Sequence, residues 1–305
     1  MMNHRALTNI KKSGLAALFL CVLGGCQSRP DDGVSGSFSL GGFLQTPYEK
    51  LEQFAAENGG EVFTAAGTPF KLTSVQSTQN LRFNASSSEL TVYIEGDGRA
   101  WLTPTMPSND PSPRSYMMVK HALADSHPAV YLARPCQFQK TESPSCTSNL
   151  WTTERFSKVV IESYGLALDQ LKLQRGVSRF HLVGYSGGGA VAMALAGQRA
   201  DVERVVTLAG NVDPQAWIQR HNLSSLGDVV NPLDYAGRLS RIPQRHYVGL
   251  KDKVVPPDLA KAFASKIGAS CADIVELQAS HEDGWGAISE TELNRAINCH
   301  QPVEF

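Results

Sequence analysis

The segment that most constrains this chain is residues 179–195, where a short apolar run, a glycine-rich turn and small helix-forming residues follow one another. Residues 180–183 are typical of a buried strand, and residues 190–196 of a helix. Between them, residues 184–188 read G-Y-S-G-G and match the pattern G-x-S-x-G. A strand, a sharp turn and a helix would place the central Ser186 in a strained conformation at the tip of the turn. The pattern is weak by itself, so its meaning depends on partners elsewhere in the chain.

The glycines around Ser186 predict close backbone packing at this turn. Gly184 and Gly188 leave room where a Cβ would collide with the neighbouring strand or helix. Gly187 supplies a backbone N–H at a helix N-terminus, where the helix dipole and unpaired donors favour a developing oxyanion. Ser186 is therefore the candidate nucleophile, and the Gly187 N–H is a candidate oxyanion donor.

A serine hydroxyl is a poor nucleophile at neutral pH and needs a base, which in turn needs an orienting acid. Asp252 follows a predicted strand at residues 246–250, and the carboxyl ends of strands are where such sheets build sites. We therefore take Asp252 as the acid. Asp213, after the preceding predicted strand, is the alternative, and Asp252 could instead be a solvated turn residue.

His281 is the candidate base because it lies in the loop after the last predicted strand, at residues 274–278. The chain order Ser186, Asp252, His281 is the order that a serine elbow of this kind uses. The other histidines are expected to lie in the N-terminal segment (His4), to pack within strands (His181, His246) or to be solvated (His121, His127, His221, His300).

The second oxyanion donor should come from the loop after the strand at residues 90–95. That loop reads Gly96-Asp97-Gly98. We expect the Asp97 N–H to be the donor, with Gly98 as the next choice. A carboxylate beside an oxyanion would be repulsive, so the Asp97 side chain should point away, toward a donor in a loop. The alternative is a purely structural glycine-rich turn.

The remaining chain alternates between predicted strands and helices. Such alternation favours a mainly parallel sheet that is covered on both faces, within a single α/β domain. Further strands are predicted at 61–65, 70–75, 129–133 and 205–209, further helices at 47–58, 115–124, 154–174, 257–267 and 289–298, a polar turn at 84–88 and mixed structure at 211–242.

The first 25 residues are typical of a targeting segment and are left out of the fold. Arg5, Lys11 and Lys12 precede an apolar run that is too short to span a bilayer. The run ends in L-G-G-C, which resembles a bacterial lipobox with Cys26 as the lipidated first residue of the mature chain. The alternative is an ordinary signal peptide followed by an incidental cysteine.

A lipidated Cys26 would hold a soluble domain on a membrane surface, because more than one acyl chain gives stable anchoring. By analogy with such lipoproteins, Gln27 indicates the outer membrane, with the domain facing the periplasm. We therefore expect a signal peptide at 1–25, a flexible Gly- and Ser-rich tether at 26–45 and one domain at 46–305.

Four cysteines remain beyond the lipid site, an even number that suits an oxidising compartment. Four cysteines allow three pairings. We favour Cys136–Cys146, which closes a local loop, and Cys271–Cys299, which ties the last strand to the last helix. Free buried thiols are the alternative, and no C-x-x-C spacing indicates zinc.

With a net charge of −1 and no basic stripe, the 305-residue chain gives no indication of nucleic-acid binding. The segments Y-I-E-G-D-G, G-Y-S-G-G-G and G-L-K-D-K-V-V-P-P, with the late His281, together resemble the α/β-hydrolase superfamily over residues 60–300. Within it the chain is similar to small exported bacterial hydrolases that have E-G-D-G in place of the commoner His-Gly oxyanion loop.

The resemblance implies an acyl-transfer hydrolase without a cofactor, acting on small-molecule acyl esters through Ser186, His281 and Asp252. A carboxylesterase is the first choice, because no long lid insertion is evident between residues 211 and 242. A thioesterase or peptidase would use the same triad, and a non-catalytic envelope lipoprotein could use the same fold for binding. Five aromatic or methionine side chains could line an acyl pocket or simply be buried in packing: Trp101, Met106, Tyr116, Trp217 and Trp285.

Overall fold

The computed structural model describes residues 45–79, 88–297 and 299. The predicted signal peptide, Cys26 and almost all of the predicted tether lie outside the described residues, as does most of the predicted turn at 84–88. No helix in the described part of the chain is long and apolar enough to cross a bilayer.

Eight strands form one sheet in the order β1-β2-β6-β3-β7-β8-β9-β10, and β4 pairs with β5 in a separate hairpin. The strands of the large sheet are β1 (Gly60–Ala66), β2 (Lys71–Ser77), β3 (Glu89–Ile94), β6 (Ala129–Leu132), β7 (Arg179–Tyr185), β8 (Val202–Leu208), β9 (Gln244–Gly249) and β10 (Ala272–Leu277). From β6 to β10 every neighbouring pair is parallel, whereas β2 is antiparallel to both of its neighbours.

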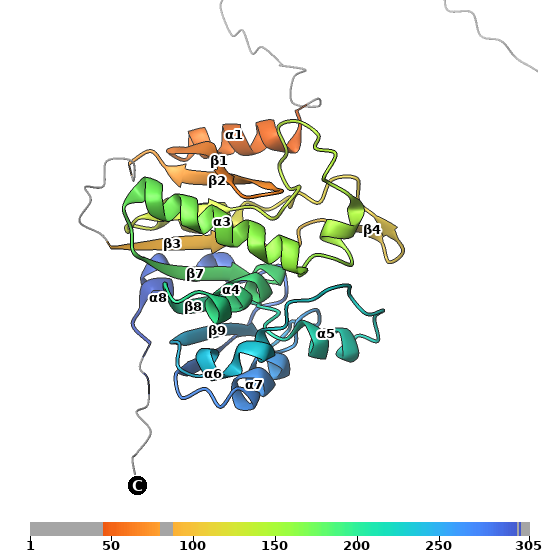
Figure 1. The fold of residues 1–305 in the computed structure, drawn as a ribbon, viewed down its shortest axis with the longest axis vertical. Coiled ribbons are helices and arrows are strands. Elements are labelled where there is room, and N and C mark those ends of the chain that lie inside the picture. The colour runs from red at the N-terminus through yellow and green to blue at the C-terminus, as the bar shows by residue number, and fades with distance from the viewer. Residues whose placement is uncertain (1–44, 80–87, 298, 300–305) are drawn as a thin grey trace, which may run out of the picture. The chain divides into compact units, whose positions relative to one another are not determined.

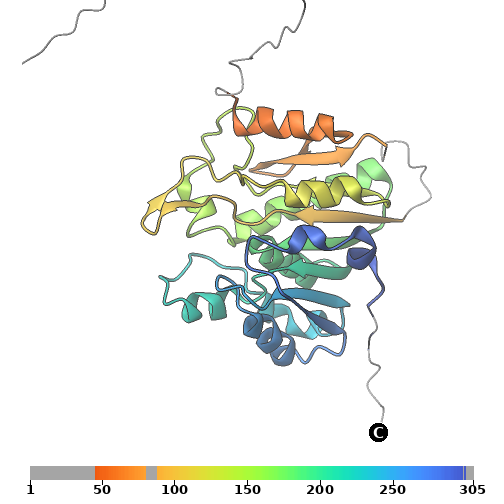
Figure 2. The same ribbon diagram turned by 180° about the vertical axis from the view of Figure 1, so that it is seen from behind.

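Helices cover both faces of the sheet (Figures 1 and 2). The α-helices are α1 (Pro47–Glu57), α2 (Met117–Ala124), α3 (Lys158–Arg175), α4 (Gly187–Gln198), α5 (Pro214–Arg220), α6 (Ala236–Leu239), α7 (Pro257–Lys266) and α8 (Glu290–Asn294). Short 3-10 helices lie at Ser148–Trp151, Pro232–Tyr235 and Trp285–Ala287. Residues of α3, α4, α6 and α7 pack into the core on one face, and residues of α1, α2 and α8 into the core on the other.

The two cores follow from the alternation of side chains along each strand. Along β3, Val92 belongs to the core on the α3 and α4 face, and Tyr93 to the core on the α1 and α2 face. Along β7, Leu182 belongs to the core on the α3 and α4 face, and Val183 to the core on the α1 and α2 face. Both faces of these strands are apolar, which is typical of a buried parallel sheet. The predicted α/β class is confirmed.

Several predicted boundaries were wrong. The helix predicted at 154–174 begins only at Lys158, after its N-cap residue Ser157, and the last helix ends at Asn294 rather than near residue 298. The strands at 61–65 and 70–75 are both edge-like in sequence, but only β1 lies at the edge, whereas β2 lies between β1 and β6. The hairpin of β4 (Trp101–Thr103) and β5 (Met106–Pro107) was not predicted.

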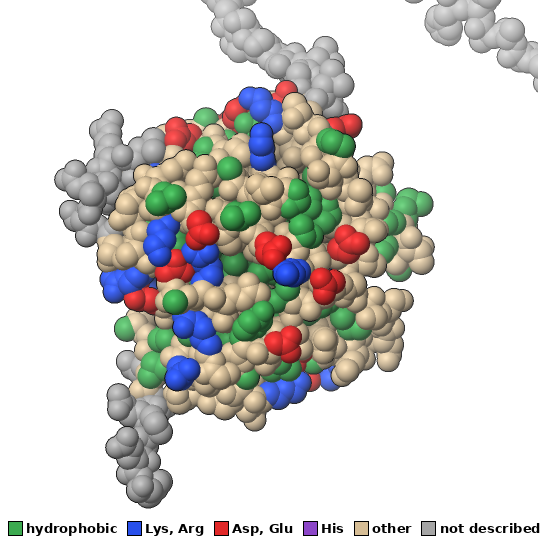
Figure 3. All heavy atoms as spheres, viewed as in Figure 1, with side chains coloured by type: hydrophobic (Ala, Val, Ile, Leu, Met, Phe, Trp, Pro, Cys, Tyr) green, Lys and Arg blue, Asp and Glu red, His purple; other side chains and the backbone are tan. Residues whose placement is uncertain are grey.

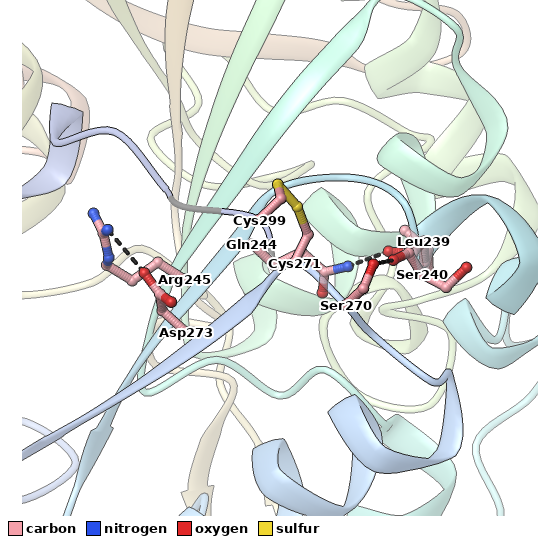
Figure 4. The surroundings of a disulfide bond; sticks show 8 residues. All are labelled: Leu239, Ser240, Gln244, Arg245, Ser270, Cys271, Asp273 and Cys299. Carbon is pink, nitrogen blue, oxygen red and sulfur yellow. Dashed lines mark hydrogen bonds and ion pairs between the residues drawn. A yellow bond between two sulfur atoms is a disulfide. The ribbon is translucent and has the colours of Figure 1, made fainter. Parts of the chain in front are cut away.

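The structure contains the two favoured disulfides, Cys136–Cys146 and Cys271–Cys299. Cys271 lies immediately before β10, and Figure 4 shows Cys299 beside it. The same C-terminal segment is held by Arg245 of β9. Its guanidinium donates to the carbonyls of Arg295 and Ala296, at 2.9 Å each, and pairs with Asp273 of β10.

Candidate active site

Ser186 lies between β7 and α4, at the carboxyl end of a strand near the middle of the sheet (Figure 1). Its backbone has φ 50° and ψ −120°, the strained conformation that the sequence predicts. A Cβ on Gly184 would overlap the carbonyl of Gly188, and a Cβ on Gly188 would lie 2.5 Å from the Glu95 carbonyl oxygen. Only glycine at these two positions allows β7 and the end of β3 to pack this closely against the start of α4.

The structure brings the three predicted triad side chains into one hydrogen-bonded chain. Ser186 Oγ lies 2.9 Å from His281 Nε2, and His281 Nδ1 lies 2.8 Å from Asp252 Oδ2. If Nδ1 carries the ring proton and donates a hydrogen bond to Asp252, Nε2 is free to accept the serine proton. This arrangement can convert a serine hydroxyl into a nucleophile.

Asp252 is held rigidly in the loop after β9. Its side chain is fully buried, and its Oδ1 accepts the backbone N–H groups of Val254 and Val255, at 2.8 Å each. These bonds leave Oδ2 aimed at His281. The alternative acid, Asp213, has a different role, because its Oδ1 accepts the Ala216 N–H at the start of α5 and its Oδ2 pairs with Lys266 at 2.8 Å.

Two side chains fix the position of His281, a role that the sequence analysis assigned to neither, although it considered Trp285 for an acyl pocket. Tyr185 O–H and Trp285 Nε1–H both donate to the His281 carbonyl oxygen, at 2.7 and 2.8 Å. The Tyr185 ring also stacks on the imidazole, with the ring centroids 5.8 Å apart. Tyr185 directly precedes the serine, so the base is tied to the same turn as the nucleophile.

The loop Gly96–Gly98 lies against the serine turn, and we call it the oxyanion loop after the role predicted for it from the sequence. A Cβ on Gly96 would lie 3.0 Å from the Tyr185 ring and 3.3 Å from Ser186 Cβ. A Cβ on Gly187 would overlap the Asp97 carboxylate, so the two candidate donor residues are in contact. Gly98 has φ +63° and lies against Pro111 and Gln137, where a side chain would not fit.

The Asp97 carboxylate pairs with two arginines. Oδ1 lies 3.0 Å from Arg134 Nη1, and Oδ2 lies 3.3 Å from Arg155 Nε. Both arginine side chains are buried. Arg134 also donates to the Arg155 carbonyl oxygen, and Gln137 Nε2 donates to the Gly96 carbonyl oxygen at 3.0 Å. This network fixes the backbone of the oxyanion loop and pairs the carboxylate with positive charge.

The fold of the chain resembles those of solved hydrolase structures. An esterase of Pyrococcus furiosus, Pf2001, superimposes with a TM-score of 0.53 at 14% identity, over 73% of this chain and 83% of the esterase. The acylaminoacyl peptidase of Pyrococcus horikoshii superimposes with a TM-score of 0.51 at 14% identity, over 77% of this chain and 39% of the peptidase. The sequence matches no protein-family model, and a search of curated proteins finds no match either.

These two structures and the strand order of the sheet settle the architecture. The chain has the α/β-hydrolase fold. In this α/β-hydrolase fold Ser186, Asp252 and His281 follow β7, β9 and β10, so all three lie at the carboxyl ends of parallel strands.

The carboxyl group of Glu95 is buried directly below the oxyanion loop. Its Oε1 accepts the Gly96 N–H at 2.9 Å, and its Oε2 accepts the Tyr131 O–H at 3.0 Å. Burial raises the pKa of Glu95 from its ordinary value of 4.5 to about 7, although both hydrogen bonds and the charge of Arg134 oppose that rise. The α/β-hydrolase domain thus holds a titratable group next to its candidate site.

We expect Glu95→Gln to remove a pH dependence of stability. Because the folded-state pKa is raised, the contribution of Glu95 is fully present below about pH 4.5 and is lost as pH rises through about 7. The difference corresponds to about 3 kcal/mol in the free energy of unfolding. Urea unfolding across this pH range should show that the free energy of unfolding declines more steeply with pH for the wild type than for the variant. Parallel curves would contradict the assignment.

Among the described residues, no histidine other than His281 hydrogen-bonds to Ser186 or Asp252. His181 and His246 are buried in β7 and β9, as expected. His121 was expected to be solvated but is buried, because α2 turns its ring toward Tyr93, 6.4 Å away between centroids. His127 has an exposed ring, whereas His221 is half-buried against the Val254 carbonyl oxygen. His4 and His300 lie outside the described residues.

The five candidate pocket residues differ in their burial and in their neighbours. Trp285 is fully buried, and the half-buried Tyr116 stacks on Phe54 of α1, so neither lies open at the mouth of the site. Trp217 of α5 is half-buried and lies 5.1 Å from the Arg155 guanidinium. Trp101 and Met106 are exposed on the β4–β5 hairpin.

A cavity of about 280 Å³ lies away from the triad, beside the start of β6. It is lined by Ser126, His127, Glu290, Thr291, Asn294 and Arg295. Within the described residues, no three His, Cys, Asp or Glu side chains are grouped so that they could hold a metal ion.

Proposed function

We propose that this chain is a serine hydrolase of the carboxylesterase type, which cleaves small-molecule acyl esters through an acyl-enzyme. The observation that carries the proposal is the hydrogen-bonded chain from Ser186 through His281 to Asp252. The α/β-hydrolase fold shared with an esterase supports it.

In the first half of the reaction, Ser186 Oγ attacks the ester carbonyl carbon while His281 Nε2 takes the serine proton. The carbonyl oxygen becomes an oxyanion, which the N–H groups of Gly187 and Asp97 would stabilise. Asp252 stabilises the imidazolium that forms. When the intermediate collapses, the C–O bond to the alcohol breaks and His281 returns the proton to the departing alkoxide.

In the second half, water replaces the alcohol. His281 removes a proton from the water as its oxygen attacks the acyl carbon. When the second tetrahedral intermediate collapses, the bond from the acyl carbon to Ser186 Oγ breaks, His281 returns the proton to Oγ, and the carboxylic acid leaves. The two halves of the reaction balance with the groups of the chain, the ester and one water molecule.

The ester preference is tested with a matched pair of soluble chromogenic substrates, one ester and one amide with the same short acyl group. Residues 27–305 should hydrolyse the ester with a higher kcat/KM than the amide. A preference for the amide would favour a peptidase, the activity named for the Pyrococcus horikoshii neighbour. No hydrolysis of ester, thioester or amide would favour a non-catalytic binding role.

We also propose that the chain is exported and anchored through lipids on Cys26, with the domain at the outer membrane and facing the periplasm. The L-G-G-C segment and the disulfides support this. Mass spectrometry of the mature N-terminal peptide should find it starting at Cys26 with added acyl mass. A mature chain that starts elsewhere would contradict the anchor.

A further inference from the structure

Exposed apolar side chains are concentrated at the end of the sheet that carries the triad. Eight large apolar side chains are exposed among the described residues. Six of them follow the carboxyl ends of β3, β8 and β9: Trp101, Leu102, Met106, Leu223, Leu250 and Val254. The other two, Leu166 and Leu173, lie on α3. Such an uneven distribution of exposed apolar groups marks an interaction surface.

The β4–β5 hairpin carries three of these six side chains. Trp101, Leu102 and Met106 are 40%, 42% and 55% exposed. No residue from 100 to 109 is charged. In Figure 3, hydrophobic side chains protrude at the edge of the molecule where Figure 1 places β4, and Figures 1 and 2 both show α5 at this same end.

The hairpin is rigidly joined to the mouth of the candidate site. It begins three residues after Gly98 of the oxyanion loop. At its base, the Ser108 N–H donates to the Ala100 carbonyl oxygen at 2.9 Å, and Trp151 Nε1–H donates to the Ser108 carbonyl oxygen at 3.1 Å. Whatever surface the hairpin contacts is therefore held next to the oxyanion loop.

We propose that the hairpin 101–107 docks the domain on a lipid bilayer, so that the site receives acyl chains from that surface. The delivery of acyl chains to the site rests on the proposed function. Tryptophan with neighbouring apolar side chains and no charge suits the interface between headgroups and acyl chains. The 18 residues 27–44 separate the candidate lipid site from the described domain and could span at most about 60 Å, which keeps the hairpin within reach of the same membrane.

The test measures binding of residues 27–305, which lack the lipid site, to fluid phosphatidylcholine vesicles by co-sedimentation. The combined change Trp101→Ser, Leu102→Ser and Met106→Ser should lower the partition coefficient by about tenfold or more. The matched control, Leu166→Ser with Leu173→Ser, should keep wild-type binding. Because the hairpin carries no charge, added salt should not weaken binding.

Equal binding of the wild type and the hairpin variant would overturn the proposal, as would an equal loss in the control or no binding by the wild type. If the hairpin variant lost self-association but kept vesicle binding, the hairpin would be a contact between copies of the chain, and the proposal would also be overturned. The single change Trp101→Ser, with an unchanged melting temperature, repeats the test if the combined variant does not fold. Ser186→Ala should bind vesicles like the wild type, so docking and hydrolysis can fail separately.

Discussion

Replacing Ser186 with alanine should lower kcat for a soluble short-chain ester by about 10⁴-fold or more. The change removes only Oγ, the atom that lies 2.9 Å from His281 Nε2. The oxyanion loop and the backbone of the turn remain, so the residual rate should reflect only binding and oxyanion stabilisation. Steady-state hydrolysis of a chromogenic ester, with the rate divided by the total protein concentration, measures this effect.

A matched serine variant separates the loss of a nucleophile from a general effect of mutation. Ser265 is exposed in the last turn of α7, and no hydrogen bond links its side chain to the triad. Ser265→Ala should therefore retain wild-type turnover. If Ser186→Ala retained full activity, hydrolysis would arise elsewhere in the chain or from a contaminant, and the proposed role of Ser186 would be wrong.

The second large effect is expected for Asp252→Asn, which should lower kcat by about 10⁴-fold. An asparagine can keep its Oδ1 bonds to the Val254 and Val255 N–H groups, so the loop should hold its shape. Its amide NH₂ would replace Oδ2 and donate to His281 Nδ1. The imidazole would then carry its proton on Nε2, facing Ser186, and could not accept the serine proton.

Asp213→Asn is the control for this second prediction, because Asp213 is the other acid considered from the sequence. Asparagine can still accept the Ala216 N–H, and neither this bond nor the lost pair with Lys266 involves a triad residue. Turnover should stay within about threefold of the wild type. A larger loss for Asp213→Asn than for Asp252→Asn would reverse the assignment of the acid.

The convergence of Ser186, Asp252 and His281 could be predicted from the sequence because its constraints are local. Gly184 and Gly188 mark a turn that no larger residue fits, and apolar runs before Ser186, Asp252 and His281 place each residue after a strand. The carboxyl ends of parallel strands meet at one edge of a sheet, so convergence follows from the fold class.

The contacts that support the site could not be predicted in this way. Arg134 and Arg155 reach Asp97 from segments far from it in the chain, and no spacing rule connects them. Residue 155 was even assigned to a helix, although α3 begins at Lys158. The pairing of β4 with β5 was also missed, because strands of two and three exposed residues carry no hydrophobic alternation.

The central claim is that Ser186 is a nucleophile activated by His281 and Asp252. Its most direct test is labelling of residues 27–305 with a fluorophosphonate probe, followed by mass spectrometry of the modified peptide, because this requires no choice of substrate. We expect one label per chain, on Ser186, and none in Ser186→Ala. A label on another residue, or the same labelling in the variant, would contradict the account.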